Sequence, residues 1–460
     1  MQISIQISKA LEDAVGSANF LTDPDLTAPY GVPWAAAEGV APAAVARPAD
    51  AGEAAAVLRA CAEHGGKLVL QGGNTGLVRG GVPASTDEIV LSTTRMDSLG
   101  AVDRESLQVV AGAGMTLEDL QARLSPTGLE LQLDLGARSQ ATLGGMAATN
   151  AGGARAFRHG TMRAHVVGVE AVLADGTVIE RLGGVMKDST GYDWASILVG
   201  SEGTLALITR LRLRLREVEP SRAAALVPVD SLTDGLALAI ALRDGAIGLE
   251  AAEFVLPGAL ALVCAELGIA PPAGMDAERP LVLLESRAPT EAFDRLVEAL
   301  AEHPEAERAV LAEGAETAKL WRYREGLGEA LTHHRVVKLD VALPLARLVA
   351  GVAALEAAAQ QAGGSDIRPY LFGHLLDGNV HVNIGAVAPE RRPAVERAAL
   401  EAVLAHGGSI GAEHGIGRAK VDWLAADRSP ADIAAMTSLK SALDPKAILT
   451  PGVLLAHPPR

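Results

Sequence analysis

Short apolar runs and alternating apolar and polar positions predict β-strands in the first half of the chain. KLVLQ (67–71) and EIVLS (88–92) are compact apolar segments, and SLQVVAGAG (106–114) alternates along its length. A helix is expected to begin after these strands at Thr116, where a hydroxyl precedes the acidic residues of a first turn. The pattern indicates β-rich units that are separated by helices.

Two further patterns predict a hairpin and a domain boundary. VEAVLADGTVIERL (169–182) places Asp175-Gly176 between two apolar strands, and this pair suits the positive φ angles of a two-residue type I′ turn. ITRLRLRLREVEP (208–220) alternates leucine with arginine until Pro220 interrupts the pattern. The first domain is therefore expected to end near this proline.

The second half of the chain mixes helical and strand patterns. Helical text such as LTDGLALAIALRD (232–244) alternates with strands such as PLVLLES (280–286) and RVVKLDVALP (335–344), which is typical of an α+β domain. GIAPPAGMDAERP (268–280) is expected to form a surface loop because it is rich in proline and glycine. The expected division has three parts: residues 1–218 with a core at about 40–218, residues 221–395, and a mainly helical segment at 396–460.

Length and charge narrow the class of protein. A chain of 460 residues exceeds the roughly 250–300 residues at which single cores stop growing, so two or three domains are expected. The formal charge of −16 is spread along the chain, whereas nucleic acids and anionic membranes attract clustered lysine and arginine. A small molecule or another protein is the expected partner.

The cysteines and the N-terminus favour the cytoplasm. Cys61 and Cys264 lie far apart in the sequence, each within an apolar segment. We therefore expect reduced, buried thiols and neither a disulfide framework nor a thiolate metal motif. MQISIQISKALEDAVG lacks the continuous apolar region of a signal peptide. No apolar run approaches the ~20 residues of a membrane span.

Three glycine-rich clusters indicate a large cofactor. LQGGNTGLVRGGVP (70–83) follows an apolar strand, and glycines let successive backbone N–H groups converge on a phosphate. The chain has no P-loop motif, and AGAGMTLEDL (111–120) lacks the third glycine of a dinucleotide fingerprint, so nicotinamide binding is unsupported. Two more clusters, at 134–163 and 187–213, bring further small residues into the same domain.

GHLLDGNVHVN (373–383) concentrates polar residues in an alanine-rich chain. If Asp377-Gly378 is the two-residue turn of a hairpin, His374 lies directly opposite His381 on one face of the sheet. Both imidazoles could then reach one divalent cation, and Asn379 and Asn383 would share that face. From this stretch alone, a metal site and a hairpin with surface histidines are equal alternatives.

A carboxylate further along the chain favours the metal site. GAEHGIG (411–417) offers Glu413 between small residues as a third ligand. Two histidines and one glutamate with an open position are typical of a catalytic metal, because structural zinc is normally closed by four protein ligands.

Six motifs together resemble a known family. They are QGGNTGLVRGGVP, DLGARSQATLGGMAATNAGGAR, KDSTGYDWASILVGSEGTLALIT, GHLLDGNVHVN, GAEHGIG and LDPKAILTPG, in this order. The chain resembles the FAD-binding oxidoreductases of the vanillyl-alcohol oxidase and p-cresol methylhydroxylase superfamily, and within it the D-2-hydroxyglutarate, D-lactate and glycolate dehydrogenases. The likeness to the D-2-hydroxyglutarate dehydrogenases is greatest. It implies an α+β fold with a two-part FAD-binding domain, an α+β substrate (cap) domain and a helical C-terminal segment that completes the flavin and metal site.

The resemblance implies non-covalent FAD. The residues that it places at the cofactor are Gly72, Gly73, Asn74, Thr75, Gly76, Ser139, Gly144, Gly145, Asn150, Gly160, Glu202, Gly203 and Ile208. His64 and His159 are the candidates for a covalent link, which some branches of the family have. The chain departs from the family at Ala206, where glycine is usual, and at Thr450, where asparagine is usual.

The resemblance also implies a metal and substrate site. Its residues are His374, His381 and Glu413 as metal ligands, His414 as catalytic base and substrate contact, and Arg324, Lys338 and Asn383 as further substrate contacts. Zinc is the expected metal, with manganese or iron as alternatives. Leu376 stands where the family usually has glycine, and Gly328 stands where the hydroxyglutarate enzymes carry a hydroxyl residue.

The implied reaction is the oxidation of a D-2-hydroxy acid, foremost D-2-hydroxyglutarate, to the 2-oxo acid. The metal would lower the pKa of the substrate hydroxyl, His414 would accept its proton, and the α-hydrogen would leave as hydride to flavin N5. D-lactate or glycolate oxidation, a non-catalytic flavoprotein subunit and a metal-dependent hydrolase are the alternatives. The electron acceptor (an electron-transfer flavoprotein, a quinone or a cytochrome) and the oligomeric state, a homodimer included, stay open.

Overall fold

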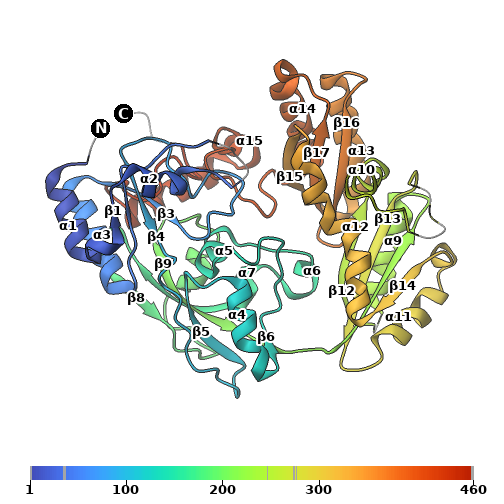
Figure 1. Ribbon diagram of the computed structural model, residues 1–460, viewed down its shortest axis with the longest axis horizontal. Helices are drawn as coiled ribbons and strands as arrows, with labels where there is room; N and C mark the ends of the chain where they lie inside the picture. Colours follow the sequence, from blue (N-terminus) through green and yellow to red (C-terminus); the bar gives the residue numbers. More distant parts are fainter. Residues whose placement is uncertain (1–2, 35–37, 246, 273–274, 276, 457–460) are drawn as a thin grey trace. The chain divides into compact units, whose positions relative to one another are not determined.

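The computed structural model describes the chain apart from residues 1–2, 35–37, 246, 273–274, 276 and 457–460. It divides the chain into two compact units (Figure 1). Unit 1 comprises Met1–Gly153, His159–Glu217 and His414–Arg460, and unit 2 comprises Ala154–Arg158 and Val218–Glu413. The boundary before Val218 lies close to the expected one. Unit 2 extends beyond the expected break at 395, because helix α14 (Arg392–Ala405) belongs to it.

The first sheet of unit 1 is mostly parallel. Its strand order is β1-β2-β4-β3, in which β2, β4 and β3 run parallel and β1 is antiparallel to β2. The strands are β1 (Phe20–Leu21), β2 (Ala44–Ala46), β3 (Lys67–Gln71) and β4 (Glu88–Ser92). Helix α3 (Ala51–His64) begins at Asp50, whose carboxylate accepts a hydrogen bond from the Glu53 N–H, and ends at Gly65 in the left-handed conformation. It packs with α1 (Ile5–Val15) in one apolar core.

The second sheet of unit 1 is antiparallel and has the order β5-β9-β7-β8. The strands are β5 (Gln108–Gly112), β7 (Val166–Val172), β8 (Val178–Arg181) and β9 (Leu207–Arg214). The helices that share its core are α4 (Leu117–Leu124), α5 (Leu143–Thr149), α7 (Met162–His165) and α8 (Trp194–Leu198). Helix α4 begins where the sequence predicts, because the Thr116 hydroxyl accepts a hydrogen bond from the Asp119 N–H.

The expected hairpin at 169–182 forms, but its turn is longer than two residues. Leu173 and Thr177 are still joined by a backbone hydrogen bond, which leaves three residues, 174–176, in the loop. Gly176 takes a positive φ of 82°, and the Asp175 carboxylate accepts a hydrogen bond from the Thr177 N–H. The Asp-Gly pair therefore ends a three-residue loop and does not form the whole turn.

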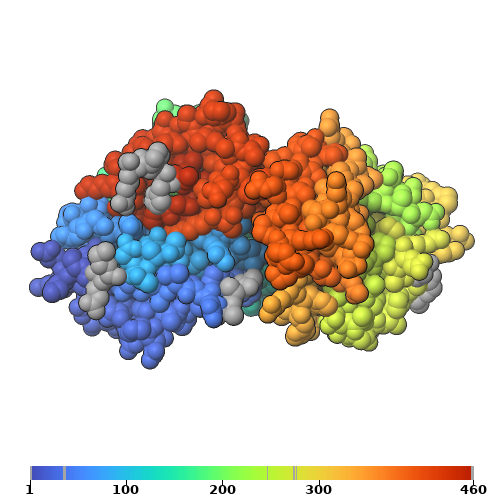
Figure 2. Space-filling model, turned by 90° about the horizontal axis from the view of Figure 1, so that it is seen from above, coloured from blue at the N-terminus to red at the C-terminus, as the bar shows by residue number. Residues whose placement is uncertain are grey.

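The C-terminal residues return to the first sheet of unit 1. Leu68 on β3 exchanges backbone hydrogen bonds with this segment, donating to Ile448 and accepting from Thr450. Figure 2 shows C-terminal residues, in red, resting on N-terminal residues, in blue. The segment includes the helices α15 (Leu424–Asp427) and α16 (Pro430–Leu443).

Unit 2 is built on one antiparallel sheet of seven strands in the order β14-β11-β13-β12-β16-β17-β15. The strands are β11 (Ser221–Pro228), β12 (Leu249–Val255), β13 (Leu281–Ala288), β14 (Val310–Glu313), β15 (Val337–Ala342), β16 (Arg368–His374) and β17 (Asn379–Gly385). Helices α10 (Pro257–Leu267) and α12 (Thr317–Ala330) pack on the face that carries Val255 and Phe372. Helix α9 (Leu232–Asp244) lies on the opposite face, where Gly235 meets Val282.

The remaining helices of unit 2 are α11 (Ala292–Ala301) and α13 (Leu348–Gly363), and α13 packs against α14. The expected surface loop at 268–280 joins α10 to β13, although its residues 273–274 and 276 lie outside the described part. Cys61 and Cys264 are free thiols; Cys61 is buried as expected, whereas Cys264 is only partly buried. Within the described part of the chain, no helix is long and apolar enough to cross a membrane.

Candidate functional site

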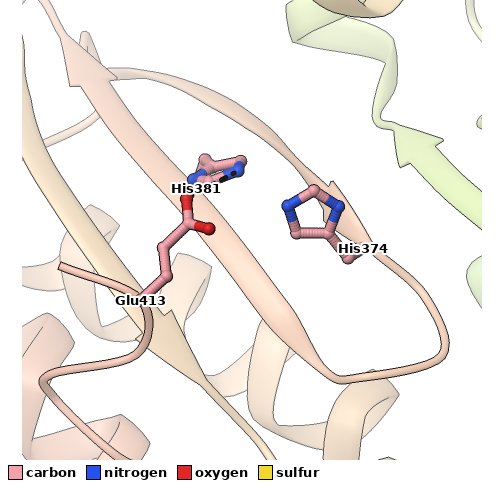
Figure 3. Close-up of side chains that lie close together, drawn as sticks. All are labelled: His374, His381 and Glu413. Atoms are coloured by element: carbon pink, nitrogen blue, oxygen red, sulfur yellow. Dashed lines mark ion pairs between the residues drawn. The ribbon is translucent and has the colours of Figure 1, made fainter. Parts of the chain in front are cut away.

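The two histidines of GHLLDGNVHVN lie on one face of the unit 2 sheet, together with Glu413. Their ring centroids are 5.3 Å apart, and Nε2 of His381 lies 4.0 Å from Oε1 of Glu413. One ligand atom from each of the three residues lies within 4.8 Å of the others. Figure 3 shows the Glu413 carboxylate pointing toward His381, while His374 faces the same space from the neighbouring strand. The predicted ligand trio is therefore brought together.

The predicted register of this hairpin is wrong by one residue on each strand. His381 lies opposite Phe372, so the loop holds four residues, 375–378, and the histidines are diagonal neighbours. The Asp377 carboxylate accepts a hydrogen bond from the Asn379 N–H, and Gly378 has a φ of 77°. The histidines still share one face because the loop gained two residues, which preserves the alternation of side chains.

Each histidine is held by a buried carboxylate on the strand that flanks the β16-β17 hairpin on its side. Glu253 on β12 pairs with His374, and its Oε1 lies 2.6 Å from Nδ1 of that ring. Asp340 on β15 pairs with His381, and its Oδ1 lies 3.0 Å from Nδ1. Neither carboxylate was among the residues predicted from the sequence. An acidic residue inside each apolar strand, LEAAEFV and VKLDVA, was the signal that could have found them.

The two histidines have opposite electrostatic environments. Burial lowers the pKa of His374, but the charge and hydrogen bond of Glu253 outweigh it and raise this pKa to about 9. For His381 burial dominates over Asp340 and lowers the pKa to about 4. Burial and the charge of Asp340 raise the pKa of the Glu413 carboxyl to about 7. A divalent cation among these groups would favour their deprotonated forms, which metal binding requires.

The predicted substrate residues Arg324, Lys338 and Asn383 all lie near this face. Nε of Arg324, on α12, donates a hydrogen bond to Oε2 of Glu253 (2.7 Å), and its guanidinium group stacks over the Phe372 ring at 4.6 Å. Lys338 pairs across the strands with Asn383. Loss of hydration lowers the pKa of Lys338, and the charge of Asp340 opposes this shift.

Asn383 carries a sign of a bound ligand. Its side chain is buried, and neither its amide nitrogen nor its oxygen has a hydrogen-bond partner in the described part of the chain. An unpaired buried amide costs roughly 1–3 kcal/mol per group, so a partner from outside the chain is expected.

Two departures from the family motifs are accommodated here. Leu376 is buried in the four-residue loop and does not prevent the ligand trio from forming. Gly328 lies one helical turn after Arg324 on α12, and a Cβ added there would meet no atom within 4 Å. The missing hydroxyl at this position is thus not compensated by a larger neighbour.

The first two glycine clusters pack closely together in unit 1. A Cβ added at Gly73 would overlap the carbonyl oxygen of Gln140, and one added at Gly72 would overlap the hydroxyl of Thr142. Asn74 takes a left-handed φ of 54° and donates from its side chain to the Val32 carbonyl. Gly72 and Gly73 are therefore required by this packing alone.

Gly76 differs from Gly72 and Gly73 in the same loop. A Cβ there would meet no atom within 4 Å, and its φ lies outside the range that favours glycine. Neither packing nor backbone conformation requires a glycine here, so the position has room for a group that approaches the backbone closely.

The second cluster forms helix α5 and its flanking turns. The Thr142 hydroxyl accepts the N–H of Gly145, and Gly144 lies against Ala113. Asn150 ends the helix with a φ of 53°, and its side-chain oxygen accepts hydrogen bonds from Thr161 and from the backbone of Arg163. The Asn150 side chain thus holds the next loop, a role that the sequence did not predict.

The remaining predicted cofactor residues fall into four settings. Gly160 and Gly203 have positive φ angles of 82° and 71°, Ile208 is buried in β9, Ser139 is exposed, and Thr75 is half-buried.

Glu202 anchors the loop that follows His414. Its carboxylate accepts the N–H groups of Ile416 (2.9 Å) and Gly417 (2.7 Å). Burial raises the pKa of Glu202, and the two N–H groups oppose that shift. His414 itself directly follows the metal-ligand candidate Glu413 and begins the last segment of unit 1.

The comparisons with known proteins identify both halves of the chain. Residues 42–181 match the family model described as an FAD binding domain, and residues 218–454 match the C-terminal domain of FAD linked oxidases. The chain belongs to the FAD-linked oxidases. It is an FAD-dependent oxidoreductase, and the expected α+β fold with a p-cresol methylhydroxylase-type FAD-binding domain is confirmed.

Relatives and solved structures of the FAD-linked oxidases cover nearly the whole chain. A protein of Bos taurus named D-2-hydroxyglutarate dehydrogenase, mitochondrial, is 35% identical over 97% of this chain and 82% of its own. A D-2-hydroxyglutarate dehydrogenase of Xanthomonas citri pv. viticola is 34% identical over 97% of this chain and 96% of its own. Substrate-bound p-cresol methylhydroxylase has a TM-score of 0.78 at 14% identity and covers 97% of this chain and 95% of its own. At that identity the structural likeness concerns the fold.

Proposed function

We propose that this oxidoreductase uses FAD and a divalent metal to oxidise a D-2-hydroxy acid to the 2-oxo acid, with D-2-hydroxyglutarate as the substrate. The observation that carries the proposal is the convergence of His374, His381 and Glu413 beside Asn383, whose buried amide has no partner in the described chain. The names of the relatives support the same substrate.

The glycine loops of unit 1 fit a large cofactor. Gly76, which neither packing nor φ explains, would allow the backbone to approach the pyrophosphate of FAD. Bound without a covalent link, FAD supplies an acceptor for two electrons and the α-hydrogen of the substrate. The residues that would hold it are those of the three glycine clusters.

The ligand trio of unit 2 fits a catalytic cation. Two imidazoles and one carboxylate suit zinc, and manganese or iron are alternatives with the same donors. A cation that binds the substrate hydroxyl supplies Lewis-acid assistance and lowers the pKa of that hydroxyl. Three protein ligands leave positions open for a substrate.

The other side chains would bind the substrate and move its proton. Arg324 and Lys338 offer positive charge for carboxylates, and Asn383 offers an amide donor and acceptor. His414 accepts the hydroxyl proton at a ring nitrogen, because an imidazole, with an ordinary pKa of about 6.5, is a competent base at neutral pH. Two cations for two carboxylates favour a dicarboxylic substrate over D-lactate.

The glycine at position 328 is a reason to test smaller hydroxy acids as substrates. A residue with a hydroxyl at this position would project from the same side of α12 as Arg324, so its absence removes one potential contact to a distal carboxylate. D-lactate or glycolate is therefore the second proposal for the substrate.

Anaerobic reduction of the flavin distinguishes these substrates. The purified protein is mixed without oxygen with D-2-hydroxyglutarate, L-2-hydroxyglutarate, D-lactate or glycolate, and the flavin absorbance is recorded; the metal content of the same sample is measured by mass spectrometry. Rapid bleaching by D-2-hydroxyglutarate alone supports the proposal. Bleaching by D-lactate without bleaching by D-2-hydroxyglutarate would overturn the proposed substrate. Activity of a metal-free protein would overturn the proposed metal dependence.

The acceptor and the cellular location are further proposals. We propose an electron-transfer flavoprotein or a quinone as the acceptor, and the reduced enzyme can be mixed with each to find which restores the flavin spectrum. The cytoplasm is the proposed location, and cell fractionation tests it against the mitochondrial location that the name of the Bos taurus relative gives.

A further inference from the structure

The sheet of unit 2 places a carboxylate beside each histidine of the ligand trio in the same way. In the strand order β12-β16-β17-β15, the hairpin strands β16 and β17 carry the histidines, and the flanking strands β12 and β15 carry the carboxylates. Glu253 is the direct cross-strand partner of His374, and Asp340 is that of His381. Both side chains are almost completely buried, with exposed fractions of 0% and 1%.

Each carboxylate contacts the Nδ1 atom of its own histidine. They accept from Nδ1 of each imidazole, at 2.6 Å and 3.0 Å. A carboxylate at this position favours the tautomer that carries its proton on Nδ1 and leaves the lone pair of Nε2 for a cation. Nε2 of His381 does face Glu413.

The further contacts of the two carboxylates differ. Asp340 also accepts the side-chain N–H of Asn379 (2.9 Å) and the backbone N–H of Glu413 (3.1 Å), so it positions two of the three ligands. Glu253 instead accepts Nε of Arg324 (2.7 Å), so it joins a ligand histidine to a proposed substrate cation. The carboxylates on the flanking strands β12 and β15 therefore have separable roles.

We propose that Glu253 and Asp340 are positioning residues that fix the Nδ1-protonated tautomer of His374 and His381 and thereby set the metal affinity of the site. This inference rests on the proposed metal dependence. It adds that Glu253 also holds Arg324 in place for the substrate, whereas the hydrogen bonds of Asp340 reach the ligands His381 and Glu413 and the neighbouring Asn379.

Zinc titration of the metal-free holoprotein tests the inference without any measurement of turnover. Chelator-stripped protein that retains FAD is titrated with zinc in competition with a chromophoric chelator. Glu253→Gln and Asp340→Asn are expected to weaken the zinc Kd by about 10- to 100-fold, the usual effect of removing a partner of a metal-bound histidine. The flavin spectrum and circular dichroism of each variant confirm that it is folded.

Glu250→Gln is the matched control. Glu250 lies on β12 like Glu253, its side chain is 1% exposed, and it pairs with Arg158 (2.9 Å). A zinc Kd like that of the wild type is expected for this variant. Glu253→Asp is the second variant in case Glu253→Gln is unfolded; it keeps the charge but withdraws the carboxylate by one methylene, and an intermediate loss of affinity is expected.

Substrate kinetics at saturating zinc separate the two carboxylates. Glu253→Gln should still raise the KM for the hydroxy acid because Arg324 has lost its anionic partner, and this rise should exceed that of Asp340→Asn, because Glu253 is the carboxylate that binds Arg324 directly. Folded variants whose zinc Kd stays within twofold of the wild type would overturn the inference while the proposed function stands. A wild-type protein that binds no zinc, manganese or iron would overturn the metal dependence and this inference together.

Discussion

The two units build their sites from different materials. In unit 2, side chains on adjacent strands converge, and each ligand histidine is fixed by a buried carboxylate. In unit 1, glycines, left-handed turns and backbone groups form the glycine clusters, and polar side chains such as Asn150 mainly hold the loops. The unit 2 site depends on which ligand atoms its side chains provide, whereas the glycine clusters of unit 1 depend on the absence of side chains.

This difference predicts different sensitivities. A side-chain site fails when a ligand atom is removed, because no neighbour can replace that atom at the same position. A backbone site tolerates the loss of side chains but fails when a Cβ is added where backbone or cofactor must approach closely. The substitutions below test the two kinds of site in turn.

The largest expected effect is that of His381→Ala in unit 2. Removal of one of three ligands should release the metal and reduce turnover to background, while FAD remains bound in unit 1. Metal content by mass spectrometry and the flavin spectrum of one sample measure both. His333→Ala, an exposed histidine of unit 2, is the control and should keep the metal. Retention of stoichiometric metal by His381→Ala would show that the trio is not the metal site.

His414→Ala should have the next largest effect. Loss of a general base typically costs about 10²–10⁴-fold in rate, and neither metal nor FAD should be lost because His414 is not in the proposed ligand set. Stopped-flow measurement of anaerobic flavin reduction isolates this step. A reduction rate near that of the wild type would remove His414 as the base.

The sequence predicted the strands better than the turns. Compact apolar runs located β3 and β4 at their observed bounds, because a short apolar run is a local property of the sequence. Both Asp-Gly pairs were interpreted as two-residue turns, yet the loops hold three and four residues. In each loop the aspartate accepts the N–H two residues later and the glycine has a positive φ, which suits longer loops equally well.

The partners of the histidines could not be predicted from local patterns. Glu253 lies 121 residues before His374, and only the strand order places β12 beside β16. Sequence alone gives no register between strands so far apart. The proximity of His374, His381 and Glu413 was predictable because two family motifs carry these residues, whereas Glu253 and Asp340 became visible once the sheet order was known.

Gly73→Ala tests the backbone site of unit 1. The added Cβ would overlap the Gln140 carbonyl oxygen, and overpacking of this kind costs about 1–3 kcal/mol of folding stability, so the thermal midpoint should fall and the displaced loop should bind FAD more weakly. Titration of the apoprotein with FAD, followed by flavin fluorescence, measures the FAD affinity. Gly183→Ala is the control in the same unit, because no atom lies within 4 Å of a Cβ there. Equal FAD affinity and equal thermal midpoints of both variants would contradict the close packing of the two loops.

Thr450→Asn is expected to have the smallest effect and a stabilising one. Thr450 has a φ of 38°, which disfavours a β-branched side chain, and its buried hydroxyl has no partner in the described chain. Asparagine tolerates this conformation, so relief of the strain should contribute up to about 1 kcal/mol and raise the thermal midpoint of the apoprotein. Leu454→Asn, at another left-handed position, is the comparison.

The FAD affinity of Thr450→Asn decides what the strain at this position does. Because Thr450 donates its backbone N–H to Leu68 on β3, the strand that leads into the first glycine loop, a relaxed residue 450 could alter that loop. A more stable apoprotein with unchanged FAD affinity would mean that the strain is incidental. Higher stability with weaker FAD binding would mean that unit 1 keeps a strained residue to shape its cofactor loop. A lower thermal midpoint would show that the threonine is the better residue here and would refute the argument from φ.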